Sequence, residues 1–295
     1  MKLCLGTVQF GMDYGVYNQK KKDEEYCIRC MDYATQNGIY SIDTATAYGI
    51  AEQVTGDFLA KKTIPREKLF LSTKLLPNIL DNCKLEEYKS VIKENITRSL
   101  QTLNTDYIDA YLLHSSRYAF NPEILEALQA IQKDGLARHV GVSVYYPEEA
   151  LACIESPYVD YIQAPYSLFD HRMKEQGVFD KKQDVLMDVR TIFVKGLIRL
   201  EADNVPDHLA KAKPILKELD KICKETGYSR IELAMGYVKR QTEINQIVFG
   251  IRNLEQLKED IDAFEKDIPR SVFADMESIF ANIDADIVIP SLWVK

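Results

Sequence analysis

The stretch YSIDTATAYG, residues 40–49, decides how the rest of the chain is interpreted. It begins as a short β-strand and breaks into a loop of small residues that carries a carboxylate, Asp43, and a phenol, Tyr48. A phenol has an ordinary pKa of about 10, so it is a poor acid at neutral pH unless its surroundings lower that value. A nearby ammonium group would do so, because it favours the phenolate. The stretch therefore predicts an acid–base site that also requires a cation.

Two later strand-like runs end on groups that could complete such a site. The run LFLSTK, residues 69–74, ends at Lys74, and the run YIDAYLLH, residues 107–114, ends at His114. In a parallel barrel, the carboxyl ends of the strands and the loops after them form one active face. We therefore expect Asp43, Tyr48, Lys74 and His114 to meet at that face.

Apolar, β-rich runs alternate with helical patterns along the whole chain, which predicts βαβ units and a parallel sheet. Most runs are continuously apolar, as in strands that are covered on both faces. The stretch Pro122–Lys133 has apolar residues at helical spacing. Eight such units predict an α/β fold of the (β/α)8 TIM-barrel type. The predicted strands are Leu3–Thr7, Tyr40–Asp43, Leu69–Thr73, Ile108–Leu113, His139–Ser143, Tyr161–Gln163, Thr191–Val194 and Gln246–Phe249.

An open, doubly wound sheet is the alternative fold. It would be expected to carry a glycine fingerprint after its first strand, and the chain has neither a G-x-G-x-x-G motif nor a P-loop. The long interval before the last strand holds two helical patterns, Lys211–Thr226 and Arg230–Arg240, which we interpret as an extra helix in the last repeat. No Pro/Gly/Ser-rich linker divides the chain, so residues 1–295 are predicted to form a single domain. A further helix is expected at Val272–Ile283.

Composition excludes several classes of function. The 295 residues are 46% hydrophobic and carry a net charge of -8, without the basic stripe that nucleic-acid binding requires. No apolar run is long enough to cross a bilayer, and the N-terminus lacks the regions of a signal peptide. We therefore expect a cytoplasmic protein with reduced cysteines. Cys27 and Cys30 form a C-x-x-C pair, but their helical context and the lack of a second pair favour two buried helix residues over a metal or redox site.

The quoted residues resemble the aldo-keto reductase superfamily, whose members are NAD(P)H-dependent (β/α)8 barrels. The opening LGTVQFG, residues 5–11, is similar to the family's first motif, and Asp43 with Tyr48 and Glu52 is similar to its Asp–Tyr signature. Lys74 and His114 stand at the strand ends where the family keeps them. In this chemistry Tyr48 would be the general acid for a reduced carbonyl, with Lys74 lowering its pKa and Asp43 orienting the lysine. His114 would polarise the carbonyl oxygen.

The resemblance also implies a nucleotide site in the second half of the barrel. It places Ser143 and Gln163 at the carboxamide of a nicotinamide ring. After the last strand, Gly250 and Arg252 open a helix whose amides and dipole suit a phosphate. Gln256 stands where many relatives use arginine for the 2′-phosphate, which weakens the case for NADPH over NADH. NADPH is still the expected cofactor, and NADH stays possible.

Three features depart from the family pattern. Val144 follows Ser143 where many relatives have asparagine, and Arg190 aligns where relatives stack a tyrosine on the nicotinamide. A guanidinium can stack on a ring, but beside an oxidised, positively charged nicotinamide it would favour the reduced cofactor or bind an anion. The chain also starts at the first strand, so we expect a barrel without the usual N-terminal hairpin and with some other cover for its floor.

The substrate is expected to be a small carbonyl compound. The loops after the first, third and fourth strands supply candidate contacts, and Arg117 and Arg190 would favour a charged substrate such as a carboxylate, phosphate or sugar nucleotide. Two alternatives to carbonyl reduction stay open: a cofactor-binding regulatory subunit with little turnover, and a lyase that uses Lys74 to form a Schiff base. The oligomeric state is left open, and no metal site is predicted. The candidate substrate contacts are Met12, Tyr14, Leu75, Leu76, Arg117 and Tyr118.

Overall fold

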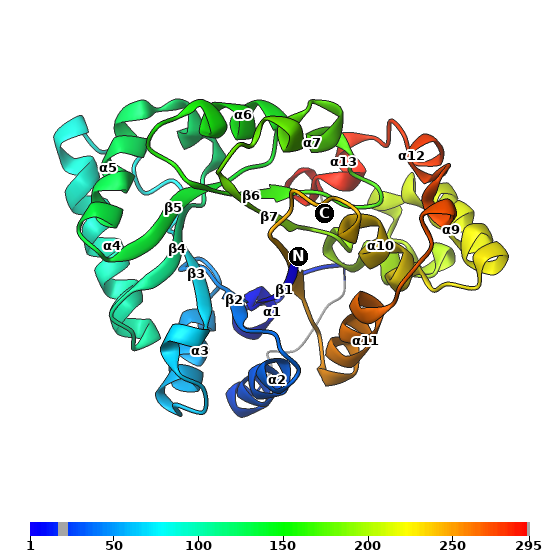
Figure 1. Cartoon of the computed structure of the whole chain (residues 1–295), viewed down its shortest axis with the longest axis horizontal. Coiled ribbons are helices and arrows are strands. Elements are labelled where there is room, and N and C mark those ends of the chain that lie inside the picture. The colour runs from blue at the N-terminus through cyan, green and yellow to red at the C-terminus, as the bar shows by residue number, and fades with distance from the viewer. Residues whose placement is uncertain (17–22, 294–295) are drawn as a thin grey trace.

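Eight parallel strands form a closed barrel in chain order. The computed structural model describes residues 1–16 and 23–293. Strand β1 pairs with β2 on one side and with β8 on the other, which closes the ring. Figure 1 shows the strands at the centre with the major helices outside them. The predicted (β/α)8 barrel is confirmed. The strands are β1 (Lys2–Gly6), β2 (Ser41–Asp43), β3 (Phe70–Leu75), β4 (Ile108–Leu113), β5 (Ala137–Ser143), β6 (Tyr161–Pro165), β7 (Leu186–Arg190) and β8 (Gln246–Gly250).

Helices lie between successive strands because each buries one apolar face on the barrel. In α5 the side chains of Ile124, Leu125, Leu128 and Ile131 are buried, and the Asn121 side chain caps the helix by accepting from the Ile124 amide. The extra helix predicted before the last strand is present, because α9 and α10 both lie between β7 and β8. The α-helices are α1 (Val8–Gly11), α2 (Glu24–Gln36), α3 (Ala51–Ala60), α4 (Tyr88–Leu103), α5 (Pro122–Lys133), α6 (Pro147–Glu155), α7 (Arg172–Glu175), α8 (Val178–Lys181), α9 (Ala212–Thr226), α10 (Arg230–Lys239), α11 (Leu254–Glu265), α12 (Met276–Ile279) and α13 (Ala285–Val288).

Short 3₁₀ turns join many of these elements. They are η1 (Arg66–Lys68), η2 (Leu85–Glu87), η3 (Ser116–Phe120), η4 (Val194–Arg199), η5 (Ala202–Asn204), η6 (Asp207–Leu209), η7 (Arg270–Phe273) and η8 (Pro290–Leu292). In α2, Cys27 and Cys30 are buried, as expected for two core residues of a helix.

The prediction for the seventh strand was wrong. The strand is β7, Leu186–Arg190, and the predicted run 191–194 is a turn in which Thr191 and Val194 have φ values of 67° and 45°. Asp188 interrupts the apolar pattern of the true strand, so the run after it appeared more strand-like. The structure accommodates this acid because the Tyr161 hydroxyl donates to it, and burial raises the pKa of Asp188 to about 8. A carboxyl group with so high a pKa is largely neutral near pH 7 and tolerates the core.

The predicted C-terminal helix is confirmed only in part. The segment 272–283 forms η7 and α12 as two short pieces, with Asp275 between them. Phe273, Met276 and Phe280 are buried at helical spacing. Their burial explains the helical pattern in the sequence, although the segment is divided into two short helical pieces.

Aromatic rings plug the N-terminal end of the barrel, where a cover other than the usual hairpin is expected. Phe70, at the start of β3, stacks on Tyr161, at the start of β6, with ring centroids 5.9 Å apart. His139 of β5 lies 6.2 Å from the same tyrosine ring. The barrel floor is therefore covered from within by side chains of its own strands.

Candidate active site

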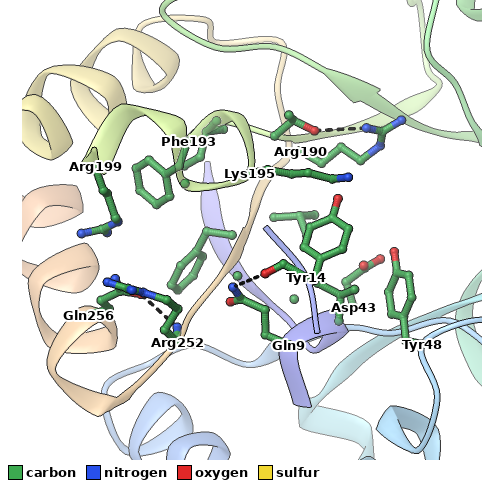
Figure 2. Close-up of a pocket in the computed structure, with 18 of the residues that line it drawn as sticks. Gln9, Tyr14, Asp43, Tyr48, Arg190, Phe193, Lys195, Arg199, Arg252 and Gln256 are labelled. Atoms are coloured by element: carbon green, nitrogen blue, oxygen red, sulfur yellow. Dashed lines mark hydrogen bonds between the residues drawn. The ribbon is translucent and has the colours of Figure 1, made fainter. Parts of the chain in front are cut away.

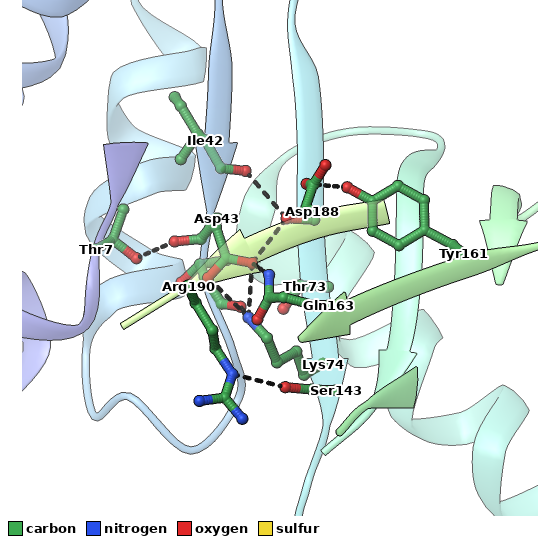
Figure 3. Close-up of polar contacts among 12 residues, drawn as sticks. Thr7, Ile42, Asp43, Thr73, Lys74, Ser143, Tyr161, Gln163, Asp188 and Arg190 are labelled. Atoms are coloured by element: carbon green, nitrogen blue, oxygen red, sulfur yellow. Dashed lines mark hydrogen bonds and ion pairs between the residues drawn. The ribbon is translucent and has the colours of Figure 1, made fainter. Parts of the chain in front are cut away.

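A buried ion pair forms the base of the site. Lys74 is fully buried, and its Nζ lies 2.7 Å from both carboxylate oxygens of Asp43 and 2.9 Å from the carbonyl oxygen of Thr44. The Ser72 hydroxyl and the Gln163 amide donate to the same oxygen of Asp43 at 2.9 and 2.8 Å. Figure 3 shows these contacts converging from β2, β3 and β6. Both charges are compensated, and the ammonium group is held in one position.

Close backbone contact positions the Tyr48 loop. A Cβ at Gly11 would lie 1.7 Å from the carbonyl oxygen of Tyr48, and one at Gly49 would lie 2.3 Å from that of Gly11. Gly49 also has a φ of 58°. Only glycine permits this approach at both positions. The loop therefore packs against α1, with the Lys74 ammonium 5.3 Å from the Tyr48 ring centroid.

The electrostatics of Tyr48 differ from the prediction. Its pKa is raised above the ordinary value by burial first and by the negative charge of Asp43 second, while Arg190 acts in the opposite direction. The net shift is opposite to the predicted one, and the Lys74 ammonium is paired with Asp43. The phenol consequently keeps its proton at neutral pH, which is the state a proton donor needs.

His114, after the end of β4, lies next to this phenol. The rings of Tyr48 and His114 meet edge to face, with centroids 5.7 Å apart. Burial lowers the pKa of His114 to about 3, and the charges of Lys74 and Arg190 add to the effect. Its Nδ1 is buried and has no hydrogen-bond partner among residues 1–16 and 23–293. The side chain is therefore a neutral imidazole whose ring nitrogens are suited to a polar ligand.

The depressed pKa of His114 predicts a pH-dependent stability. The unfolded chain takes up a proton near pH 6.5, and the folded protein does so only near pH 3. Wild-type protein should therefore lose stability relative to His114→Asn as the pH falls, by about 3 kcal/mol between pH 7 and pH 4. Urea unfolding at each pH measures this difference. His208→Asn, at an exposed position, controls for the loss of one histidine, and a pH-independent difference between wild type and His114→Asn would contradict the prediction.

An elongated cleft runs from the phenol across the C-terminal end of β1 and β8. It contains about 850 Å³ of empty space, open solvent included. Figure 2 shows Tyr14, Asp43 and Tyr48 at one end of the cleft and Arg199, Arg252 and Gln256 at the other. The glycines of both strand ends, Gly6 and Gly250, also line the cleft, and without a side chain they let a ligand approach the backbone.

The structure brings together the residues predicted to bind the cofactor. Gln163, Arg190, Gly250, Arg252 and Gln256 all line the cleft. Ser143 contacts it indirectly, because its hydroxyl accepts from Nε of Arg190 at 3.3 Å. At the far end, Oε1 of Gln256 accepts from the backbone amide of Arg252 at 2.9 Å.

The predicted substrate contacts are only partly assembled. Tyr14 lines the cleft, but Arg117 and Tyr118 do not. One terminal nitrogen of Arg117 donates to both carboxylate oxygens of Asp81, and the Tyr118 hydroxyl donates to the same carboxylate at 2.6 Å. The proposal that Arg117 selects a charged substrate is therefore corrected: it ties together the loops after β3 and β4.

The three remaining candidates also lie outside the cleft. Leu75 is buried in the core, whereas Met12 is 44% exposed and Leu76 is 39% exposed. Met12 and Leu76 follow β1 and β3 as predicted, whereas Leu75 is the last residue of β3 and not a loop residue. The directions of the three side chains were not accessible to sequence reasoning.

The loop after β7 supplies cleft residues that sequence reasoning missed. Phe193, Lys195 and Arg199 line the cleft, and the Lys195 ammonium lies 4.5 Å from the centroid of the Tyr14 ring. Arg199 is paired with Glu259 and with the fully buried Asp260 of α11. Had β7 been predicted at its true position, five residues earlier, this loop would have been recognised as the segment that follows a strand end.

Within the described ranges, no cluster of three or more His, Cys, Asp or Glu residues could hold a metal ion. Across the same residues, none of the helices combines the length and apolar character that a membrane crossing requires.

The comparisons with known proteins agree with this geometry. The model of the aldo/keto reductase family matches residues 2–281. The uncharacterized oxidoreductase YrpG of Bacillus subtilis (strain 168) is 29% identical, and the match covers 95% of this chain and 92% of YrpG. The NADH-specific methylglyoxal reductase of Escherichia coli (strain K12) is 26% identical over 82% of this chain and 83% of its own length.

A solved structure gives the same fold. The holo form of an aldo-keto reductase from Bacillus halodurans superimposes with a TM-score of 0.76 at 24% identity, covering 94% of this chain and 91% of that chain. Fold, cleft and relatives together define an oxidoreductase built on a (β/α)8 barrel. The chain belongs to the aldo/keto reductase family.

Proposed function

We propose that the protein reduces an aldehyde or ketone to an alcohol with NAD(P)H, and that Tyr48 is the general acid. The observation that carries the proposal is the joint placement of Asp43, Lys74, Tyr48 and His114 at one end of the cleft. When bound, the nicotinamide cofactor supplies the hydride. Reduction of aldehydes by purified protein with NADPH or NADH, measured as nucleotide oxidation, tests the proposal; a protein that binds nucleotide but reduces no carbonyl would contradict it.

Each side chain at this end of the cleft has a separate role in the proposed reaction. Tyr48 holds a proton at neutral pH because burial and Asp43 raise its pKa. The neutral His114 can donate a hydrogen bond to a carbonyl oxygen without introducing a second full charge. The Asp43–Lys74 pair fixes the ammonium group beneath the phenol ring. The proton thus lies beside the position where negative charge develops on the substrate oxygen.

The cleft fits a dinucleotide. Gln163 offers a neutral amide side chain beside the phenol, and two arginines, Arg199 and Arg252, lie at the other end, where phosphates are favoured. Arg199 is already paired with Glu259 and Asp260, which reduces its net attraction for an anion. We assign the 2′-phosphate to Arg252 because it lines the cleft just before α11, whose N-terminal amides also favour a phosphate. We expect NADPH to bind more tightly than NADH, with NADH still usable.

Replacing Arg252 by glutamine should weaken NADPH binding by roughly ten- to hundredfold, because one charge-assisted hydrogen bond contributes about 1.5–3 kcal/mol. NADH binding should change by less than about twofold, because NADH lacks the 2′-phosphate. Fluorescence titration with each nucleotide measures both. Arg117→Gln removes the same charge outside the cleft and should change neither. Equal losses for NADPH and NADH would instead place Arg252 at a phosphate common to both nucleotides.

The structure argues against the lyase alternative. A Schiff base requires a neutral and accessible amine. Lys74 is fully buried and its ammonium contacts three oxygen atoms. The regulatory-subunit alternative is separated from the reductase by the aldehyde assay, because such a subunit would bind nucleotide with little turnover. We propose a cytoplasmic location for the protein, as expected from its sequence.

A further inference from the structure

Arg190, at the end of β7, places a rigid guanidinium group in the cleft. Its Nε donates to the Ser143 hydroxyl at 3.3 Å, and its two terminal nitrogens donate to the Val144 carbonyl oxygen at 2.7 Å and the Thr191 hydroxyl at 3.1 Å. The group also lies 4.4 Å from the centroid of the Tyr145 ring. Hydrogen bonds to three partners and a stacked ring fix its plane, as Figures 2 and 3 show in part.

The charge of this guanidinium has no opposing partner. Its three hydrogen-bond acceptors are neutral, and no carboxylate of the described residues lies within ion-pair distance of it. The acid in the cleft nearest to the phenol, Asp43, is bound by Lys74 through both oxygens. The positive charge of Arg190 acts on the reacting end of the cleft: it contributes to the low pKa of His114 and opposes the rise in the pKa of Tyr48.

We propose that Arg190 makes the site discriminate between the two redox states of its nucleotide, binding the reduced form more tightly than the oxidised form. The inference rests on the proposed function, because it requires the nicotinamide ring to lie between Gln163 and Tyr48. The reduced ring is neutral, whereas the oxidised ring is a cation. A fixed cation beside it therefore repels only the oxidised form.

Two unit charges about 4–5 Å apart, even in a partly hydrated site, interact strongly enough to change a dissociation constant by roughly ten- to hundredfold. The 2′-phosphate is the same in both redox states and cancels in the comparison. The ratio of the oxidised to the reduced dissociation constant should therefore be similar for NADP⁺/NADPH and for NAD⁺/NADH. Weak binding of the oxidised nucleotide favours its release and turnover in the direction of carbonyl reduction.

The test is an equilibrium titration of the wild type and its variants with all four nucleotides. The chain has one tryptophan, Trp293, whose ring centroid lies 5.6 Å from the ammonium group of the cleft residue Lys195. Its fluorescence provides a binding signal that does not depend on turnover, and calorimetry provides a second. Arg190→Gln removes the charge and keeps an amide donor, whereas Arg190→Lys keeps the charge and loses the plane. Arg252→Gln removes a charge at the other end of the cleft.

We expect the oxidised-to-reduced ratio to exceed ten in the wild type and in Arg190→Lys, and to fall at least fivefold in Arg190→Gln. Arg252→Gln should weaken NADP⁺ and NADPH by the same factor and leave the ratio unchanged. Thermal unfolding of each variant establishes that it is folded. Equal binding of both redox states by the wild type, or an unchanged ratio in Arg190→Gln, overturns this inference and leaves the reductase proposal standing. Binding of none of the nucleotides overturns both.

Discussion

Replacing Tyr48 by phenylalanine is expected to lower kcat/KM for aldehyde reduction by about a thousandfold, within the range that a general acid contributes. The substitution removes one hydroxyl group and preserves the ring, which packs against His114 and over Lys74. Nucleotide affinity should therefore stay within about twofold of the wild type, because the loss affects the transition state and not cofactor binding. Steady-state kinetics and a nucleotide titration on the same preparation separate the two effects.

Tyr14→Phe is the matched control for this experiment. Tyr14 also lines the cleft, and burial raises its pKa as it does for Tyr48. It differs in its surroundings, because its ring contacts the Lys195 ammonium and not the Asp43–Lys74 pair. We expect Tyr14→Phe to lose less than about tenfold in kcat/KM, since it is not placed as the proton donor. Similar losses in both variants, or a Tyr48→Phe protein that keeps a tenth of its activity, would remove Tyr48 from this role.

Replacing Lys74 by methionine should destabilise the protein by about 3–5 kcal/mol, which is the usual cost of breaking a buried ion pair from one side. Asp43 would then remain as a buried carboxylate whose charge has lost its partner. The double variant Asp43→Asn/Lys74→Met should recover most of the lost stability, because it removes the uncompensated charge. Neither variant should reduce aldehydes, since both lose the arrangement beneath Tyr48. Chemical denaturation measures the stability of each.

Lys93→Met provides the comparison for a surface pair. Lys93 pairs with Asp134 while its side chain is 52% exposed, and solvent-exposed pairs contribute about 0–1 kcal/mol. A Lys74→Met protein that loses no more stability than Lys93→Met would show that the Asp43–Lys74 pair does not stabilise the barrel. If Asp43→Asn/Lys74→Met is as unstable as Lys74→Met, the loss of stability results from altered packing and not from an unpaired charge.

Local sequence patterns were sufficient for most of the architecture. Seven of the eight predicted strands overlap the strands of the structure, and α5 has the predicted bounds. The error at β7 has a physical cause, because Asp188 is a polar residue inside a buried strand. Its compatibility with the core depends on Tyr161, which is 27 positions away in the chain. No local pattern could reveal that partner.

In the candidate site, too, some features follow from local sequence patterns and others depend on contacts between distant residues. The positions of Asp43, Lys74 and His114 at successive strand ends follow from the alternation of strands and helices, because parallel strands present their carboxyl ends at one face. The ion pair of Arg117 could not be predicted, since its partner Asp81 lies on a different loop. The direction of the pKa shift at Tyr48 could not be predicted either, because it depends first on the burial of the phenol and then on the charge of Asp43.

The amino-acid order by itself determined the barrel, the order of its strands and the set of ionisable groups at its mouth, since periodicity and strand ends are local properties of a chain. Only the tertiary structure decided which charges compensate one another: Lys74 with Asp43, Arg117 with Asp81, and Arg190 with no acid among the described residues. Electrostatic energies depend on distance and burial, and both are set by contacts between segments that are far apart in the sequence.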